Sequence, residues 1–253
     1  MAAPLRIVFW NIRAGGGKRA QAIADQLTAW QPDLIGLSEF RGTPASQALA
    51  HTLSEAGWPH QIETTQSDAP ARNALLLASR WPLRRRRMRA MPVLRDRWLL
   101  AQVMMPRPLT LGLMHAPNYT APDLKYPMLE AILGLAARWR YGPALIGGDT
   151  NSGLRHLDEE KPGSAGFQRE HDFVEGMGAR QWADAFRHLH GERREYTWYS
   201  HRDNGFRLDH AFLDPHLTSH LRACRHDWGT NPAQPQRREG LSDHAALILD
   251  LDW

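Results

Sequence analysis

The sequence predicts a single α/β domain over residues 1–253, and three observations support this fold class. The chain has 253 residues, of which 42% are hydrophobic, so it can bury one sizeable core. Apolar runs of strand length recur from residue 5 to residue 251, with helical patterns between them. No repeat and no linker-like segment divides the chain. Interspersed strands and helices are typical of one α/β domain, and not of a sheet domain beside a helical one.

The first quarter of the chain alternates strands with helices. Strands are predicted at residues 5–10 and 33–39. Apolar residues recur at helical spacing over residues 19–30, and Pro32 ends that helix. Thr43 and Pro44 resemble an N-cap followed by a first-turn proline, and they open a second helix that ends near Gly57.

The remainder of the chain is richer in strands. They are predicted at residues 73–79, 98–105, 109–114, 144–148, 196–200, 207–213 and 245–251. A helix is predicted from Pro122 to Arg140, with Leu129 and Ile132 on its buried face. Residues 153–166 are polar and rich in glycine, which predicts a surface loop.

Charge and cysteine content bound the partners and the compartment. The net charge is +4 and the pI is about 9.6, which weakly favours a polyanionic partner. A codon bias toward arginine would explain the same composition. The single cysteine excludes an intrachain disulfide, so we expect a reducing, cytoplasmic location. No apolar run is long enough for a membrane span, and no obligate protein partner is indicated.

Residues 80–97 are dense in arginine, with Asp96 as their one acid. The arginines stand at positions 80, 84, 85, 86, 87, 89, 95 and 97. The run Arg84, Arg85, Arg86 and Arg87 is a candidate for contacts along a phosphate backbone. The alternative is a solvated edge strand that its charges protect from pairing with other chains.

Polar side chains recur where the apolar runs end. They are Asn11, Glu39, His115, Asp149, Asn151, Asp209, Asp243 and His244. A carboxylate at a strand end can project into a shared cleft while the strand holds it rigid. Oxygen ligands without a cysteine cluster suit Mg²⁺ or Mn²⁺ better than structural zinc. Each position taken alone is more simply explained as a turn or a helix cap, but that explanation weakens for so many in succession.

The order of these residues resembles the endonuclease/exonuclease/phosphatase superfamily, which includes DNase I-like and exonuclease III-like enzymes. The matching segments are Phe-Trp-Asn-Ile-Arg at 9–13, Leu-Ser-Glu at 37–39, His-Ala-Pro-Asn at 115–118, Gly-Asp-Thr-Asn at 148–151, Arg-Leu-Asp-His at 207–210 and Ser-Asp-His at 242–244. They cover almost the whole chain. The resemblance implies a four-layer sandwich, with two packed, mostly antiparallel sheets flanked by helices, and hydrolysis of a phosphate ester.

The resemblance also implies a role for each residue. Asn11, Glu39 and Asp243 would hold the divalent metal. Asp149 would orient or deprotonate the attacking water, and Asn151 would hold that water or the phosphate. His244 would bind the phosphate as a cation, with Asp209 supporting its ring.

The branch of the superfamily stays open. Arg13 and His115 are similar to DNase-like members, in which a histidine at the second position could protonate the leaving group. Asn118, Trp198 and Phe206 instead match abasic endonucleases, whose aromatic residues line a sugar pocket, although core packing would explain the two aromatic residues equally well. The motif set also approximates that of tyrosyl-DNA phosphodiesterases.

We therefore expect a metal-dependent phosphodiesterase acting on DNA, most simply an endonuclease of the DNase or abasic-site type. A first alternative is an enzyme of the same fold that acts on an inositol phosphate or a phospholipid head group. A second is a catalytically inactive binding module, which the complete set of polar residues disfavours.

Overall fold

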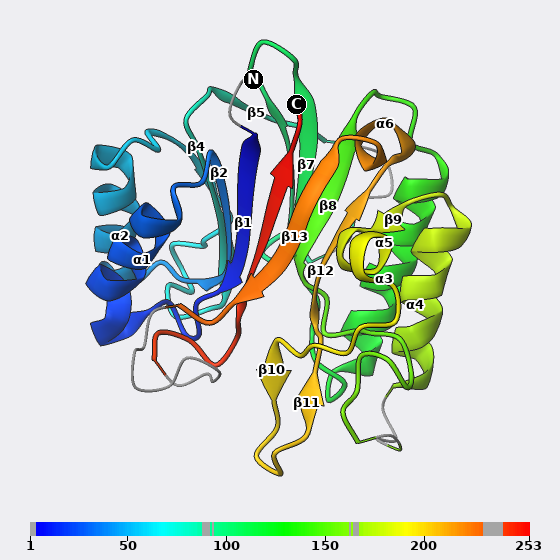
Figure 1. The fold of residues 1–253 in the computed structure, drawn as a ribbon. Coiled ribbons are helices and arrows are strands. Elements are labelled where there is room, and N and C mark those ends of the chain that lie inside the picture. The colour runs from blue at the N-terminus through cyan, green and yellow to red at the C-terminus, as the bar shows by residue number, and fades with distance from the viewer. Residues whose placement is uncertain (1–3, 88–91, 93, 162, 164–166, 230–239) are drawn as a thin grey trace.

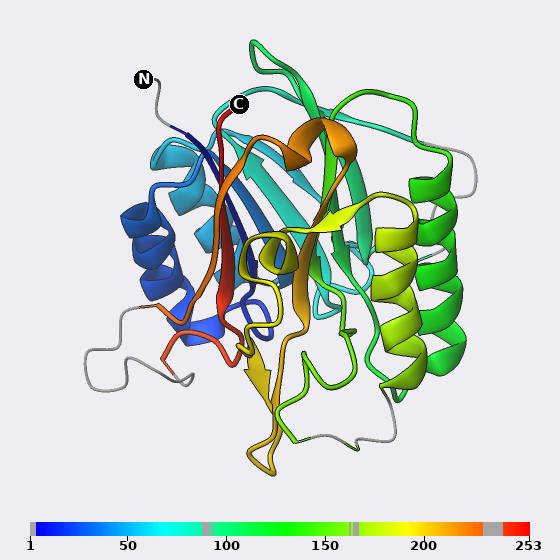
Figure 2. The ribbon, with the colours of Figure 1, turned by 45° about the vertical axis from the view of Figure 1, so that its right-hand side comes forward.

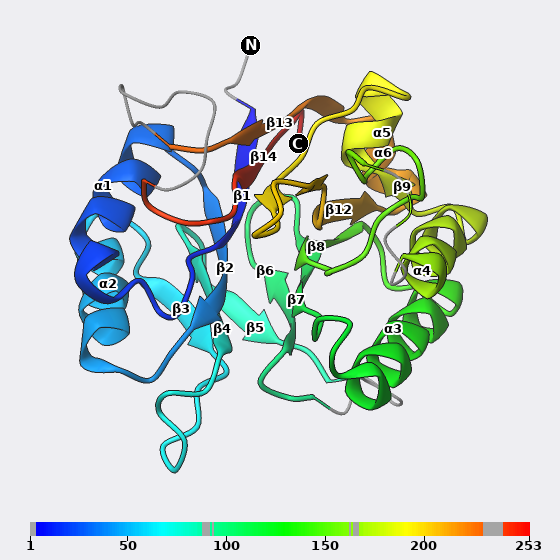
Figure 3. The ribbon, with the colours of Figure 1, turned by 90° about the horizontal axis from the view of Figure 1, so that it is seen from below.

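Four layers make up the protein: two helices, a first sheet, a second sheet and two more helices (Figure 3). The structure is a computed structural model, and it describes residues 4–87, 92, 94–161, 163, 167–229 and 240–253. Leu5 pairs with Leu251, so the first and last described strands of the chain begin and end at the same end of the sandwich (Figure 1).

The two sheets have six strands each among the described residues. The first has the order β13 (Leu221–Asp227), β14 (Ala246–Leu251), β1 (Leu5–Asn11), β2 (Leu34–Phe40), β4 (Ala74–Ser79) and β3 (His60–Glu63). The second has the order β5 (Leu83–Arg85), β6 (Trp98–Val103), β7 (Leu109–His115), β8 (Ala144–Asp149), β12 (Asp209–Leu213) and β9 (Ala183–Asp184). Among these strands only β1–β2 and β7–β8 pair in parallel. The expected sandwich of mostly antiparallel sheets is therefore confirmed.

Two pairs of helices cover the outer faces of the sheets. The first sheet carries α1 (Ala20–Trp30) and α2 (Pro44–Glu55), and the second carries α3 (Pro122–Ala137) and α4 (Gln168–Ala179). The short helices are η1 (Gly17–Arg19), α5 (Ala185–His190) and α6 (Pro215–Thr218). Ala185 and Phe186 of α5 pack into the core between the sheets, so this helix closes one side of the sandwich instead of covering a face.

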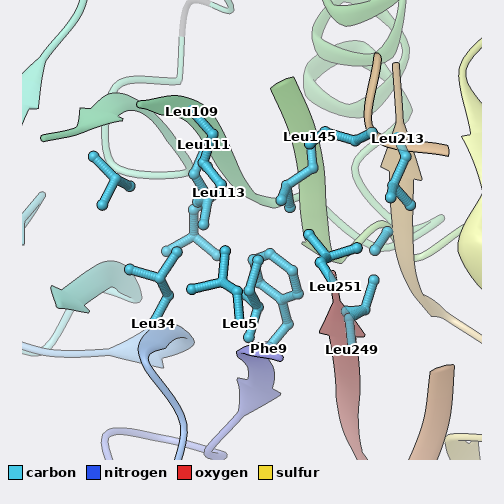
Figure 4. Packing of buried hydrophobic residues seen from close by; sticks show 14 of the residues in the cluster. Leu5, Phe9, Leu34, Leu109, Leu111, Leu113, Leu145, Leu213, Leu249 and Leu251 are labelled. Atoms are coloured by element: carbon cyan, nitrogen blue, oxygen red, sulfur yellow. The ribbon is translucent and has the colours of Figure 1, made fainter. Parts of the chain in front are cut away.

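The central core lies between the sheets (Figure 4). Leu5, Phe9 and Leu249 of the first sheet pack there against residues such as Leu113 of the second. The Phe9 ring lies against Gly147, where an added Cβ would meet it at 2.5 Å. Glycine is therefore required at this point of β8 for the sheets to approach each other.

Several elements carry too weak a pattern for the sequence to predict. They are β3, β5, β9, β13, α4, α5, α6 and the strand β11 (Gly205–Phe206). Strand β13 (Leu-Arg-Ala-Cys-Arg-His-Asp) shows no alternation of apolar and charged residues, and it is held mainly by pairing with β14. The prediction of a surface loop over residues 153–166 is partly wrong, because Asp158 and Glu159 are buried. Pro162 and residues 164–166 of that segment lie outside the described residues.

A hairpin projects from the end of the sandwich opposite the chain ends (Figures 1 and 2). It pairs β10 (Trp198–Tyr199) with β11 in antiparallel register. The segment 207–213, predicted as one strand, is a strand only from Asp209, because Arg207 turns inward to a buried cluster of acids.

Candidate active site

The predicted polar residues gather at the end of the sandwich that carries the hairpin, which Figure 3 views end-on. Within each sheet one parallel pair of strands ends there, β1–β2 in the first and β7–β8 in the second. In the second sheet His115 is the register partner of Asp149 on one side, and Asp209 is its partner on the other. Asp149 thus lies at the middle of a row of three polar residues.

Asn11 joins the two sheets at this point. Its Nδ2 donates a hydrogen bond to Asp149 Oδ2 at 2.9 Å and lies 3.4 Å from Glu39 Oε1. Both Asn11 and Asp149 are buried. One neutral amide therefore separates two carboxylates that come from different sheets.

The backbone around the site adopts conformations that favour glycine. Glu39 has φ of 57° at a bulge in β2, where the pairing with β4 shifts register between Ser38 and Phe40. The bulge aims the Glu39 side chain at the end of the sheet, where Oε2 accepts a hydrogen bond from Ala14 N at 2.7 Å. Asn151 has φ of 47°. Strained residues of this kind persist where the surrounding contacts hold them, and they cluster at functional sites.

His244 is held as a cation. Its Nδ1 donates to Asp209 Oδ2 at 2.9 Å, and its Nε2 lies 3.9 Å from Asp149 Oδ2. Burial alone would lower the pKa of His244, but Asp209 and Asp149 outweigh it and raise that pKa to about 10. The charged ring therefore lies beside Asp149.

The pKa of the Asp149 carboxyl is raised from its ordinary value. Burial, aided by the charge of Asp209, raises its pKa to about 6, although His244 and the hydrogen bonds from Asn11 and Asn151 act against this. A carboxylate with a pKa near neutrality is suited to take a proton from water.

His115 is held neutral. Arg97 Nη1 lies 2.9 Å from His115 Nδ1, and a guanidinium can only donate, so the ring must offer it a lone pair. Burial, Arg97 and His244 together place the pKa of His115 well below its ordinary value. His244 is thus the charged imidazole of the site and His115 the neutral one, and the role of His115 in protonating the leaving group stays a prediction.

Two groups of side chains could hold a metal ion. Potential ligand atoms of Asp149, Asp209 and His244 lie within 4.8 Å of one another. Two of these three residues already satisfy each other through the His244–Asp209 hydrogen bond. The carboxylates of Glu39 and Asp149 both face the Asn11 amide. The oxygen donors of Glu39 and Asp149 therefore fit a hard divalent cation better than the group of Asp149, Asp209 and His244 does.

Other predicted residues lie at the rim. Asp243 Oδ2 lies 4.0 Å from Arg13 Nε; the Arg13 side chain is largely exposed and that of Asp243 is half-buried. Asn118 is exposed, and its Oδ1 accepts hydrogen bonds from Thr120 N and Oγ1, so it shapes the turn before α3. The predicted roles of Asp243 in metal binding, and of Arg13 and Asn118 in substrate binding, stay predictions.

The arginine run lies on an edge strand. Arg84 and Arg85 belong to β5, at the border of the second sheet, and Arg87 is also exposed. Arg86 N continues the pairing with Leu100 O, while Arg85 Nη2 donates to Glu63 O of β3 in the other sheet at 2.8 Å. This placement is compatible with both sequence interpretations. Arg89 lies outside the described residues.

Trp198 of the hairpin lies beside the site, and Phe206 packs against Trp198 and Phe167. The Trp198 ring centroid is 5.9 Å from that of Phe206 and 6.4 Å from that of His244. Trp198 also forms a bridge with His244. Both aromatic side chains are half-buried, so they are not ordinary core residues.

A buried charge cluster behind the site was missed at the sequence level. Arg207 binds Asp158 through Nε at 2.7 Å and Asp184 through Nη2 at 2.8 Å. His210 Nδ1 lies 2.9 Å from Asp184 Oδ2, and its Nε2 lies 2.8 Å from Ser152 O. The cluster thereby reaches the turn that follows Asp149. Its only sequence signal was the Arg-Leu-Asp-His segment, which does not reveal the distant Asp partners.

Two comparisons with known proteins find relatives of the chain. A family model described as the endonuclease/exonuclease/phosphatase family matches residues 8–244. Among curated proteins there is no match.

In the described part of the chain, no helix combines the length and apolar character that a membrane span requires.

Several solved structures share the fold. A 3′ phosphatase from Neisseria bound to a product DNA hairpin is 21% identical with a TM-score of 0.79. A 3′-5′ exonuclease from Neisseria meningitidis is 21% identical and an AP endonuclease from Archaeoglobus fulgidus 20% identical, each with a TM-score of 0.80. Each comparison covers 98% of this chain and 100% of the other. At such identities the similarity shows the fold.

Proposed function

The chain belongs to the endonuclease/exonuclease/phosphatase family and is a phosphoester-hydrolysing enzyme, and from this premise we propose that it cleaves phosphodiester bonds in DNA with a divalent cation. The observation that carries the proposal is the position of Asp149. Its Oδ2 lies 2.9 Å from the Asn11 amide and 3.9 Å from the charged His244 ring. A base, a phosphate-binding cation and a carboxylate pair for a metal thus meet in one place.

The side chains divide the work of hydrolysis. Asp149 takes a proton from the attacking water, because its raised pKa makes it a usable base near neutral pH. Asn151 orients the water or the phosphate. His244 donates a hydrogen bond from Nε2 to a phosphoryl oxygen, while Asp209 holds the ring through Nδ1. Negative charge grows on the phosphoryl oxygens in the transition state, so a fixed cation there lowers the barrier.

Glu39 and Asn11, with Asp149 beside them, would hold Mg²⁺ or Mn²⁺, since their oxygen donors suit hard cations. When bound, such an ion supplies charge neutralisation on the phosphate and activation of water. Asp243 is a further candidate from the rim, 4.0 Å from Arg13.

Three observations favour DNA as the substrate. The similar structures are described as a 3′ phosphatase bound to a product DNA hairpin, a 3′-5′ exonuclease and an AP endonuclease. The arginines of the β5 edge offer contacts for a phosphate backbone. The aromatic pair Trp198 and Phe206 beside His244 offers an apolar surface for a sugar or base at the cleaved position.

A substrate panel tests the proposal. The parental enzyme and Asp149→Asn are assayed with Mg²⁺ and with a chelator on plasmid, abasic duplex, a 3′-phosphorylated duplex, a 5′-phosphotyrosyl oligonucleotide, RNA and an inositol phosphate. We expect Mg²⁺-dependent cleavage of a DNA substrate that Asp149→Asn abolishes. Cleavage of the inositol phosphate alone would contradict the choice of DNA, and full activity of Asp149→Asn would contradict the site.

A further inference from the structure

A buried ion pair joins the two outer helices behind the second sheet. Lys125 of α3 and Glu170 of α4 are both almost completely buried, and Lys125 Nζ lies 2.8 Å from Glu170 Oε1. Tyr126 Oη also donates to Glu170 Oε1, at 3.2 Å. Lys125 is one of three lysines in a chain whose other basic residues are arginine, apart from its histidines. A lysine presents a compact charge on a flexible stem, which suits a confined position.

The ammonium group reaches beyond its partner to the catalytic turn. Lys125 Nζ donates a second hydrogen bond, at 2.7 Å, to the backbone carbonyl of Asn151. Asn151 is the residue with φ of 47°, a conformation that costs free energy unless contacts hold it. In this conformation Asn151 N donates to Asp149 Oδ1 at 2.9 Å, and its Nδ2 donates to Ala116 O at 2.8 Å.

The pair is poorly built for stability alone. Both charges are removed from water, and Glu170 Oε2 has no hydrogen-bond partner among the described residues. Replacing a buried ion pair with apolar residues often leaves stability unchanged or raises it. The unsatisfied Glu170 oxygen is a further cost to stability in this pair. Leu129 and Phe173 of the same helices already pack in an apolar cluster against the sheet. The need to hold the Asn151 carbonyl explains why a charged pair, and not an apolar one, is buried between α3 and α4 at this point.

We propose that Lys125, oriented by Glu170, is a positioning residue for the reaction, holding Asn151 in its left-handed conformation and thereby fixing Asp149. This inference rests on the proposed roles of Asp149 and Asn151. It predicts an effect on turnover with little effect on binding, because Lys125 contacts neither the substrate nor the metal site directly.

The test compares Lys125→Met and Lys125→Gln with the parental enzyme. Methionine keeps most of the volume and removes the donor, while glutamine keeps a donor for Glu170 on a chain one atom shorter. Glu130→Gln is the matched control, because Glu130 forms an exposed pair with Arg169 across the same two helices. We expect each Lys125 variant to lose at least tenfold in kcat, with KM and Mg²⁺ affinity within about twofold of parental values. Because Glu170 then lacks its buried partner, the urea midpoint should fall as well, so kcat is compared at a temperature at which each protein is fully folded.

Two outcomes would overturn the inference. One is parental kcat in a folded Lys125 variant; the other is a reduction in activity that follows the amount of folded protein and disappears when folding is restored at lower temperature. If Lys125→Met does not fold, Lys125→Gln decides by the same criteria. Asp149→Asn is assayed in parallel. An inactive Asp149→Asn beside a fully active Lys125→Met rejects only this inference, whereas an active Asp149→Asn rejects the proposed site.

Discussion

His244 Nδ1 lies 2.9 Å from Asp209 Oδ2, so the contact links a strand of the second sheet with the segment that leads into a strand of the first. Asp209 begins β12, and His244 lies just before β14. The His244 carbonyl accepts a hydrogen bond from Trp10 Nε1 at 2.9 Å. The contact therefore exists only when both sheets are packed. It keeps the imidazole charged, with its free nitrogen turned toward Asp149.

The first prediction concerns this pair. His244→Ala should lower kcat by on the order of a hundredfold or more and change KM little, because the contact strengthens as charge grows on the phosphate. Asp209→Asn should be milder, and the double variant should show non-additive effects. His51→Ala, at an exposed position of α2, is the control. Near-parental turnover in a folded His244→Ala protein would remove this histidine from the mechanism.

The second prediction concerns the metal. Glu39→Gln should weaken Mg²⁺ or Mn²⁺ binding measured by calorimetry, because it removes one of two carboxylates around the Asn11 amide. Glu55→Gln, on an exposed face of α2, should leave binding unaltered. Equal metal affinity in Glu39→Gln and the parental protein would exclude Glu39 as a ligand.

The third prediction separates the two interpretations of the arginine run. If Arg84, Arg85, Arg86 and Arg87 bind phosphates of duplex DNA, replacing all four with alanine should reduce the slope of log K against log salt by about 0.9 for each phosphate that is no longer neutralised. The control is Arg222→Ala, because Arg222 is an exposed arginine of β13 that pairs with Asp252. Because Arg85 also holds Glu63 O, the urea midpoint must be measured as well. An unaltered salt slope would identify the run as a solvated edge.

The fourth prediction concerns acid stability. Burial opposes ionisation of Asp184, but Arg207 and His210 outweigh it and hold its pKa well below the ordinary value, and Arg207 likewise lowers the pKa of Asp158. A depressed folded-state pKa stabilises the fold above the unfolded pKa of about 3.9, and this stability is lost as pH falls toward the folded value. The free energy of unfolding should therefore decline below about pH 4.

Asp184→Asn tests this dependence. The variant should lose about 3–5 kcal/mol at pH 7, because Arg207 keeps a buried charge with one partner fewer. Its free energy of unfolding should also fall less steeply below pH 4, in urea titrations at several pH values. Asp252→Asn, in an exposed pair, should change stability by no more than about 1 kcal/mol. Equal acid sensitivity of Asp184→Asn and the parental protein would show that other carboxyls govern the transition.

Local patterns were sufficient for much of the framework. The predicted strand at residues 5–10 corresponds to β1, and the predicted helix at 19–30 corresponds to α1, because apolar spacing there matches the geometry of each element. The helix opened by Thr43 and Pro44 was predicted from its first turn. Strand β13 and helix α4 escaped prediction because their residues are mainly polar, and pairing or packing with distant segments holds them.

The sequence by itself determined which polar residues flank the strands, in what order, and hence the family and the kind of chemistry. Only the tertiary structure decided how these residues set one another's charge and position. It placed Arg97 against His115, so that His115 is neutral and His244 is the histidine that carries the charge. It also brought Lys125 to Asn151 from a helix on the outer face. The physical reason is that strand and helix periodicity is a local property, whereas charge, burial and pKa depend on partners far away in the chain.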